Sequence, residues 1–159
     1  MSEPAPAPAP TDAWGPDVLG PGFEARTLEL LPDEEDDGAV ATLVRHVPVS
    51  DPAALPGTPT TPTFALLYLH GWNDYFFQTE LARQISRLGG AFYALDLRRY
   101  GRSLRERQMP GWITSLTDYD EEISLALAAI RSERGWETDV VMCGHSAGGL
   151  TACLWADRH

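Results

Sequence analysis

Three short apolar runs limit the folds open to this sequence more than any other feature. They occupy residues 64–69, 91–95 and 138–143 and are rich in apolar side chains. Strands of this composition are typical of parallel sheets, because helices cover both faces of such sheets. The segments between the runs show helical periodicity. We therefore predict an α/β fold with right-handed crossovers and a mostly parallel sheet that is flanked by helices.

The periodicity predicts three helices around these strands. One covers residues 77–88 and ends at a Gly-Gly pair, where a helix can close with a positive φ. A longer helix has its apolar stripe over residues 116–130, and Gly135 follows its end. The last helix is predicted over residues 147–157.

The amino-terminal segments carry different signals. Residues 1–22 are rich in proline, alanine and glycine and predict a disordered tail, so one domain is expected over residues 23–159. From Phe23, alternating apolar residues on both sides of the acidic run 33–37 predict two antiparallel strands joined by a hairpin-like turn. The acidic run is interpreted as a solvated turn, with a cation site as the alternative. Residues 48–63 carry five prolines and are predicted to be a surface connection.

The net charge of -11 argues against a nucleic-acid partner, because phosphate binding requires a basic face. The start of the chain lacks the pattern of a signal peptide, and no later stretch is apolar enough to cross a bilayer, so a cytoplasmic protein without a transmembrane segment is expected. Cys143 and Cys153 lie in segments predicted to be buried and are expected to be free thiols, with a disulfide as the alternative. No histidine or cysteine spacing indicates a metal site, and no cofactor is expected.

The motif Gly144-His145-Ser146-Ala147-Gly148 follows the third predicted strand and precedes the last helix. In sheets of this type, ligands bind at the carboxyl ends of the strands. A serine hydroxyl is a weak nucleophile unless it is held exposed near a base and near donors for the oxyanion. A strand-turn-helix elbow with small flanking residues provides this exposure. Ser146 is therefore a candidate nucleophile, and a serine that caps the helix is the alternative.

Backbone N–H groups near this motif are candidates for an oxyanion hole. Ala147 lies in the first turn of the last helix, where N–H groups are free and the helix dipole is positive. The first apolar strand ends in His70-Gly71, at the sheet edge where a second donor is required.

Three segments of the sequence resemble signatures of the α/β-hydrolase superfamily, namely residues 69–74, 96–103 and 144–149. The most similar branch is the lysophospholipase and monoacylglycerol lipase group, which also includes sequences labelled serine aminopeptidase. The resemblance covers residues 23–159. It implies the amino-terminal part of an α/β-hydrolase fold with an antiparallel first hairpin, and a serine hydrolase that acts through an acyl-enzyme.

The resemblance also implies roles for individual residues. Ser146 would be the catalytic nucleophile, and the backbone N–H groups of Trp72 and Ala147 would form the oxyanion hole. Gly71 and His145 would contact the substrate. Smaller residues are frequent in the family at the position of Trp72, so its ring is expected to narrow or line the acyl pocket.

The segment 96–103 departs in part from the family pattern. Asp96, Gly101 and Ser103 would shape this loop, with Asp96 as a loop-capping carboxylate rather than a triad acid. Family members often have glycine where this chain has Arg99. The arginines of the region are interpreted as a solvated loop, with an anion site as the alternative. They are Arg98, Arg99, Arg102, Arg105 and Arg107.

The two histidines that flank the motifs are expected to be packed and hydrogen-bonded rather than to transfer protons; they are His70 and His145. The triad of this superfamily runs in the order Ser, Asp or Glu, and His. Only residues 147–159 follow Ser146, and Asp157 lies about 16 Å away along the helix at 1.5 Å per residue. We therefore expect the acid and the base to lie outside this chain, and the chain alone to have little or no esterase activity.

The leading functional prediction is hydrolysis of a carboxylic ester, with a small lipid-like substrate such as a monoacylglycerol or a lysophospholipid. An aminopeptidase or amidase that uses the same centre is the alternative among enzymes. A noncatalytic, truncated hydrolase fold used for binding is the alternative from another class. The strand that carries Cys143 is expected to leave an open sheet edge through which the chain can associate.

Overall fold

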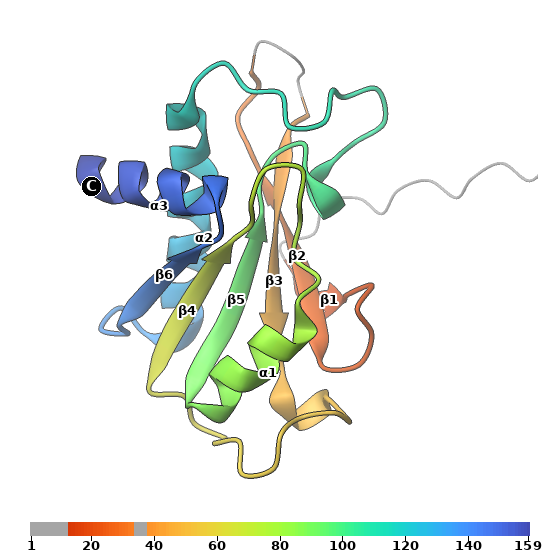
Figure 1. Ribbon diagram of the computed structural model, residues 1–159, viewed down its shortest axis with the longest axis vertical. Coiled ribbons are helices and arrows are strands. Elements are labelled where there is room, and N and C mark those ends of the chain that lie inside the picture. Colours follow the sequence, from red (N-terminus) through yellow and green to blue (C-terminus); the bar gives the residue numbers. More distant parts are fainter. Residues whose placement is uncertain (1–12, 34–37) are drawn as a thin grey trace, which may run out of the picture.

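The computed structural model describes residues 13–33 and 38–159. Within these ranges, six strands form a mixed sheet in the order β1-β2-β3-β5-β4-β6, with helices on both faces (Figure 1). This arrangement confirms the predicted α/β class. The strands are β1 (Gly15–Pro16), β2 (Phe23–Glu29), β3 (Val40–His46), β4 (Phe64–Leu69), β5 (Gly90–Asp96) and β6 (Val140–Gly144). The helices are α1 (Thr79–Arg87), α2 (Tyr119–Arg134) and α3 (Ala147–Arg158), with short 3-10 helices η1 (Pro48–Ser50), η2 (Gly101–Ser103) and η3 (Leu116–Asp118).

The parallel part of the sheet consists of β5, β4 and β6. Leu69, the last residue of β4, is level with Leu95 of β5 and with Gly144 of β6. The loops that follow these three strands therefore begin at the same edge of the sheet. Strands β2 and β3 form the predicted antiparallel hairpin, and β3 runs antiparallel to β5. The acidic residues 34–37 of the predicted turn lie outside the described ranges.

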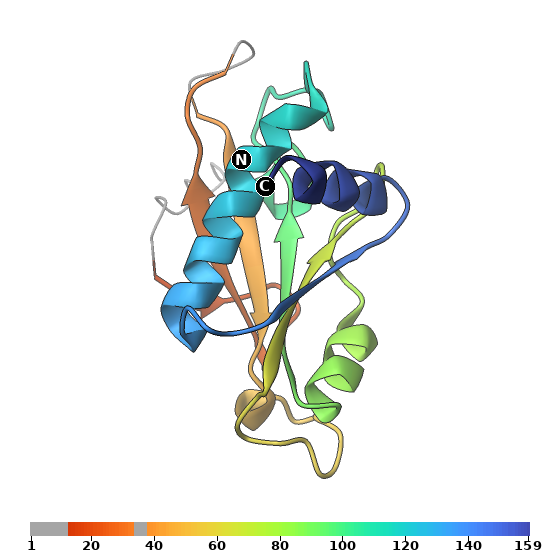
Figure 2. The same cartoon turned by 90° about the vertical axis from the view of Figure 1, so that its left-hand side faces the viewer.

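Helices α1 and α2 cover opposite faces of the sheet (Figure 2). On the α2 face, Leu67 and Leu95 belong to one buried cluster with Ile123 and Ile130. On the α1 face, Phe92 belongs to a second cluster, which includes side chains of β4 and α1. Because both faces of β4 and β5 are covered, their sequences are almost continuously apolar.

Helix α2 is shorter than the segment that its periodicity predicts. The first predicted turn is the 3-10 helix η3, which Ser115 caps by accepting a hydrogen bond from the N–H of Thr117 (3.2 Å). The helix ends at Gly135, where φ is +105°, as predicted. Among the helices of the described ranges, none is long and apolar enough to span a membrane.

Residues 13–22 differ from the predicted disordered tail, whereas residues 1–12 lie outside the described ranges. This segment forms the short strand β1 against β2. The partly buried Trp14 packs against the hydrophobic core, and the buried Asp17 forms an ion pair with Arg102 (2.6 Å). These distant contacts order a segment whose composition by itself favours disorder.

Strand β6 differs from the buried strand that its composition predicts, because it is an edge of the sheet in the described part of the chain. Val141 is 48% exposed, Cys143 is half-buried and Cys153 on α3 is exposed. Both cysteines are free thiols. An edge strand has only one strand neighbour, so its second backbone edge faces solvent. This is the open edge that the sequence predicts.

Candidate active site

Ser146 lies on a sharp turn between β6 and α3. Its φ of 54° and ψ of -119° belong to a region that residues other than glycine rarely adopt, so the backbone is strained there. A Cβ added at Gly144 would lie 2.3 Å from the nitrogen of Gly149, and one at Gly148 would lie 2.3 Å from the carbonyl oxygen of Leu69. The turn therefore excludes side chains at both flanking positions, as the motif predicts.

The loop after β4 lies directly against this turn. A Cβ added at Gly71 would lie 3.4 Å from the Cβ of Ser146. In the described ranges, the backbone N–H groups of Trp72 and Ala147 donate no hydrogen bond to another protein group. Both donors are therefore available beside Ser146, as an oxyanion hole requires.

His70 is buried and hydrogen-bonded beside these donors, as predicted. Its Nδ1–H donates to the carbonyl oxygen of Gly71 (2.8 Å), and its Nε2 accepts from the N–H of Leu97 (3.1 Å). Burial lowers the pKa of His70 below 6.5, so the ring is neutral at pH 7 and the two bonds define its tautomer. His70 thus links the loops that follow β4 and β5, and neither ring nitrogen is free to act as a base.

His145 differs from the packed histidine that the sequence predicts. Its side chain is 66% exposed, and its Nδ1 lies 3.9 Å from Oδ2 of Asp74, which is longer than a hydrogen bond. A Cβ added at Gly71 would lie 3.0 Å from this Nδ1, so one edge of the ring lies against the loop after β4 while most of the side chain is exposed. An exposed imidazole next to Ser146 remains available for the proposed contact with a substrate.

A small apolar cavity of about 60 Å³ lies next to the serine turn. Trp72 lines this cavity, is 68% exposed as a residue, and has its ring centroid 6.1 Å from that of Tyr100. The sequence predicts Trp72 as a lining residue of the acyl pocket and Gly71, which also lines this cavity, as a substrate contact. The sequence misses lining side chains from the connection between β5 and α2, from the first residue of α2 and from α3. In the sequence, Leu116 and Tyr119 carry only a helix-stripe signal. The missed residues are Leu97, Tyr100, Ile113, Leu116, Tyr119 and Thr151.

Asp96 organises the loop after β5. Its Oδ1 accepts from the N–H of Phe76 (2.9 Å), and its Oδ2 accepts from the N–H and from Nη1 of Arg102 (3.0 and 2.9 Å). Ser103 donates its hydroxyl proton to the carbonyl oxygen of Asp96 (2.7 Å). A Cβ added at Gly101 would lie 2.5 Å from Oδ2 of Asp96. These contacts support the loop-shaping roles and leave Asp96 occupied, so it is not placed as a triad acid.

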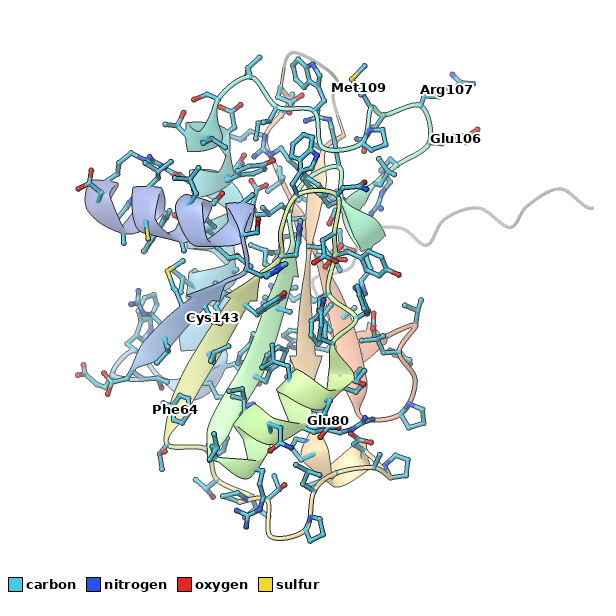
Figure 3. The ribbon with its side chains drawn as sticks, viewed as in Figure 1. Phe64, Glu80, Glu106, Arg107, Met109 and Cys143 are labelled. Atoms are coloured by element: carbon cyan, nitrogen blue, oxygen red, sulfur yellow. The ribbon has the colours of Figure 1, made fainter. Side chains whose placement is uncertain are left out.

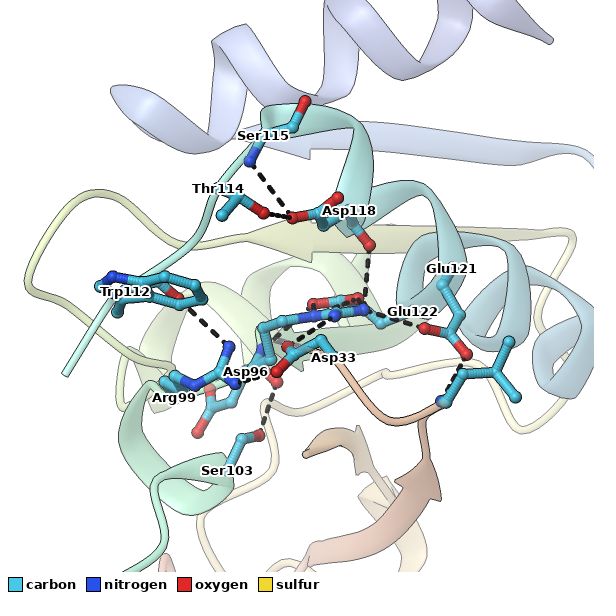
Figure 4. Close-up of polar contacts among 12 residues, drawn as sticks. Asp33, Asp96, Arg99, Ser103, Trp112, Thr114, Ser115, Asp118, Glu121 and Glu122 are labelled. Atoms are coloured by element: carbon cyan, nitrogen blue, oxygen red, sulfur yellow. Dashed lines mark hydrogen bonds and ion pairs between the residues drawn. The ribbon is translucent and has the colours of Figure 1, made fainter. Parts of the chain in front are cut away.

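The arginines of this loop differ from the solvated set that the sequence predicts. Arg98 donates from Nε to Oε1 of Glu122 (3.2 Å) and from Nη2 to Oε2 (2.7 Å), and both side chains are buried. Burial alone would lower the pKa of Arg98, but the hydrogen bonds and charge of Glu122 raise it above its ordinary value. Arg99 is buried against Asp33 (2.6 Å, Figure 4). In contrast, Arg107 is exposed at the outer tip of the loop (Figure 3).

None of the described side chains that could act as a base is hydrogen-bonded to Ser146. Among them, the Oγ atom of Ser146 has no hydrogen-bond partner. Asp157 is exposed on α3, and the ring of His159 stacks on Trp155 at 4.8 Å near the far end of that helix. The site therefore combines an exposed serine with two backbone N–H groups that have no acceptor in the described ranges, and no acid–base pair of these ranges contacts the serine.

Solved structures of hydrolases and related proteins match this fold over part of their length. The DcsB complex with its substrate analogue has a TM-score of 0.60 at 17% identity, over 84% of this chain and 40% of that chain. A soluble variant of monoglyceride lipase from Saccharomyces cerevisiae has a TM-score of 0.55 at 17% identity, over 96% of this chain and 40% of the lipase chain. Est1E from Butyrivibrio proteoclasticus with bound ferulic acid has a TM-score of 0.52 at 21% identity, over 77% of this chain and 45% of the Est1E chain. The chain thus spans less than half of each of these structures.

The strand order and the strained serine turn, together with these matches, define the class of protein as an α/β-hydrolase fold, of which this chain contains a part. The model of the family described as serine aminopeptidase, S33 matches residues 60–159, and the chain belongs to this family of serine hydrolases. No curated protein sequence matches the chain.

Proposed function

We propose that this chain carries the nucleophile of a serine hydrolase that cleaves a carboxylic ester through an acyl-enzyme. The main support is the strained turn that exposes Ser146 beside the free N–H groups of Trp72 and Ala147. In the proposed reaction, Oγ of Ser146 attacks the carbonyl carbon while its proton passes to a base. The two N–H groups then stabilise the oxyanion. The base and its orienting acid come from outside the described residues.

A lipid-like ester is the proposed substrate class. The cavity next to Ser146 is lined mainly by apolar and aromatic side chains, which favours an apolar acyl group. A volume of about 60 Å³ accommodates only the first carbon atoms of such a group. The remainder of the acyl chain would pass along the exposed ring of Trp72.

An aminopeptidase or amidase activity is the second candidate, because the family to which the chain belongs is described as serine aminopeptidase, S33. Amide hydrolysis uses the same nucleophile and the same oxyanion donors as ester hydrolysis. The two candidates therefore differ in the leaving group and in the pocket that holds it, and a comparison of substrates separates them.

The first test uses the full-length protein of the reading frame that contains this sequence, with p-nitrophenyl butyrate and alanine p-nitroanilide as substrates. We expect faster turnover of the ester, and a loss in kcat/KM of at least about 1,000-fold in Ser146→Ala. Ser132→Ala changes an exposed serine on α2 and should leave the rate unchanged. Faster turnover of the anilide would favour the amidase, and ester turnover that survives Ser146→Ala would exclude both candidates.

The second test uses residues 1–159 alone. We expect no Ser146-dependent turnover of p-nitrophenyl butyrate, because none of the described side chains is hydrogen-bonded to Oγ of Ser146 to accept its proton. Turnover by this chain at the rate of the full-length protein, with loss in Ser146→Ala, would show that this chain supplies its own base.

A further inference from the structure

A second cavity lies at the opposite end of the sheet from Ser146. Its volume is about 460 Å³, within the range of about 300 to 1,000 Å³ that small-molecule sites occupy. His46, at the end of β3, and Gly90, at the start of β5, both line it, so the cavity lies at the amino ends of the parallel strands. The proline-rich connection between β3 and β4 forms much of the remaining wall. Figure 1 shows this connection at the lower end of the sheet.

A serine, a histidine and an aspartate are connected in series at this cavity. Oγ of Ser86 lies 2.7 Å from Nδ1 of His46, and Nε2 of His46 lies 3.0 Å from Oδ2 of Asp51. All three side chains are buried, and Ser86 and His46 line the cavity. These distances satisfy the geometric signature of an activated nucleophile, in which a base contacts the nucleophile and an acid orients the base.

The charges of the neighbouring groups determine where the protons lie. Burial alone would raise the pKa of Asp51, but hydrogen bonds from Arg83, from the N–H of Ala53 and from His46 lower it below 3.8. Asp51 is therefore a carboxylate and accepts the Nε2–H of His46. Burial lowers the pKa of His46, so the ring is neutral at pH 7 and its Nδ1 accepts the hydroxyl proton of Ser86. The imidazole thus has the protonation state and the tautomer of a general base.

The packing around these side chains holds them in place. The ring of Phe23 stacks on His46 with a centroid distance of 4.9 Å. Nε of Arg83 donates to Oδ2 of Asp51 at 2.8 Å. A Cβ added at Gly22 would lie 2.2 Å from the Cβ of Asp51, so the chain at Gly22 packs tightly against the aspartate. Preorganisation of this kind is what a base and its orienting acid require.

We propose that Ser86 is a second nucleophilic serine, which His46 and Asp51 activate toward small acyl esters and related electrophiles that enter this cavity. Oγ of Ser86 forms a bond to the acyl carbon, and its proton passes to Nδ1 of His46. The bond from the acyl carbon to the leaving oxygen breaks, and the proton moves from His46 to that oxygen. The products are acyl-Ser86 and an alcohol.

Diisopropyl fluorophosphate is a suitable probe because it is small and marks activated serines. Oγ of Ser86 would form a bond to phosphorus, and fluoride would leave with the serine proton. Peptide mapping of residues 1–159 by mass spectrometry should find the added diisopropylphosphoryl group on Ser86. The rate should be the same in Ser146→Ala, and Ser132→Ala is a matched control on an exposed serine.

The series of Ser86, His46 and Asp51 is called the Ser86 relay below. Substitutions in the Ser86 relay test whether His46 acts as the base. Ser86→Ala should abolish the modification, and His46→Gln should slow it on the order of 100-fold, which is the usual contribution of a general base. Circular dichroism shows whether His46→Gln is folded, and the site mapped in the unaltered chain does not depend on that variant.

Two outcomes would overturn the inference: a folded, unaltered chain that is unmodified at Ser86, or a folded His46→Gln variant that reacts at the same rate. Modification of Ser146 is mapped on a separate peptide and bears on the proposed hydrolase function. The absence of modification at Ser86 is therefore distinguishable from the absence of modification at Ser146.

Discussion

Gly148 and Gly149 are adjacent residues that differ in their tolerance for a side chain. A Cβ at Gly148 would lie 2.3 Å from the carbonyl oxygen of Leu69 and 2.4 Å from that of His70. The nearest atom to a Cβ at Gly149 is 3.4 Å away, which is an ordinary contact. The first glycine lets α3 approach β4 closely enough to bring Ser146 beside the loop that carries the N–H group of Trp72. The second glycine has no such steric role.

This difference predicts opposite effects of the same substitution. Gly148→Ala should lower the free energy of unfolding by about 2 to 3 kcal/mol, because the added methyl group forces the backbones apart. Gly149→Ala should be neutral or stabilise the fold by up to about 1 kcal/mol, because alanine is the better helix former. Urea midpoints of the two variants provide the measurement. Equal midpoints would show that α3 does not pack on β4 as closely as described.

At the scale of the element, Arg99 anchors the connection between β5 and α2. Its φ is 63°, in the left-handed region that favours glycine, and its guanidinium is buried. Nη2 of Arg99 donates to Asp33 at 2.6 Å, and Nη1 donates to the carbonyl oxygen of Trp112 at 3.3 Å (Figure 4). The N–H of Gly111 donates to the carbonyl oxygen of Arg99 at 3.0 Å. Arg99 therefore connects Asp33, in the turn of the β2–β3 hairpin, to the segment around Trp112. The next residue, Ile113, lines the apolar cavity.

Two substitutions at Arg99 separate the ion pair from the backbone strain. Arg99→Ala should lower the free energy of unfolding by about 2 kcal/mol, because it removes the shorter of the ion pairs that Asp33 forms and the hydrogen bond to the carbonyl oxygen of Trp112. Arg99→Gly should cost about 1 kcal/mol less, because glycine adopts a positive φ without the steric penalty of a Cβ. Urea unfolding measures both values. A glycine variant less stable than the alanine variant would contradict the assigned strain.

Hydrogen exchange provides a local measurement of the same anchor. Amides of residues 109–113 should exchange faster in both Arg99 variants, because the segment loses its contact to the guanidinium. Amides of β4 should keep their protection, since this strand lies in the buried core.

At the scale of the whole molecule, two buried neutral histidines make stability depend on pH. Burial lowers the pKa of both His46 and His70 below 6.5. The unfolded chain takes up protons at these rings near pH 6.5, whereas the folded chain does not. Their contribution to stability is therefore complete above pH 6.5 and is lost as the pH falls from there toward the lowered pKa values.

We expect the free energy of unfolding to fall between pH 7.5 and pH 5.5. His70→Gln should reduce this slope, because it removes one of the two groups that resist protonation. His159→Gln changes an exposed ring at the end of α3 and should retain the slope. Urea unfolding at several pH values provides the data. Stability that is constant or rises as the pH falls would contradict the neutral state of both rings.

Much of the fold was predictable from local patterns. The hairpin of β2 and β3, the strands β4 and β5 and the three helices follow from periodicity and from glycine positions, which act over a few residues. The open edge at β6 was predicted, but the exposure of its side chains was not, because an apolar composition does not specify which neighbours cover the faces of a strand. The order of residues 13–22 was not predictable either, because it depends on the ion pair between Asp17 and Arg102, which are 85 positions apart.

The sequence by itself determined the serine turn, because the glycines that permit it, the strand before it and the helix after it all lie within one short segment. Only the tertiary structure decided which charged side chains are buried and which serine is hydrogen-bonded to a histidine. Arg98 and Glu122 are 24 positions apart, and Ser86 and His46 are 40 apart. Such pairs form when crossovers bring distant segments to one end of the sheet. Local sequence patterns do not predict these contacts. For this reason Ser146 was predicted from its motif, whereas the relay at Ser86 became visible only in the fold.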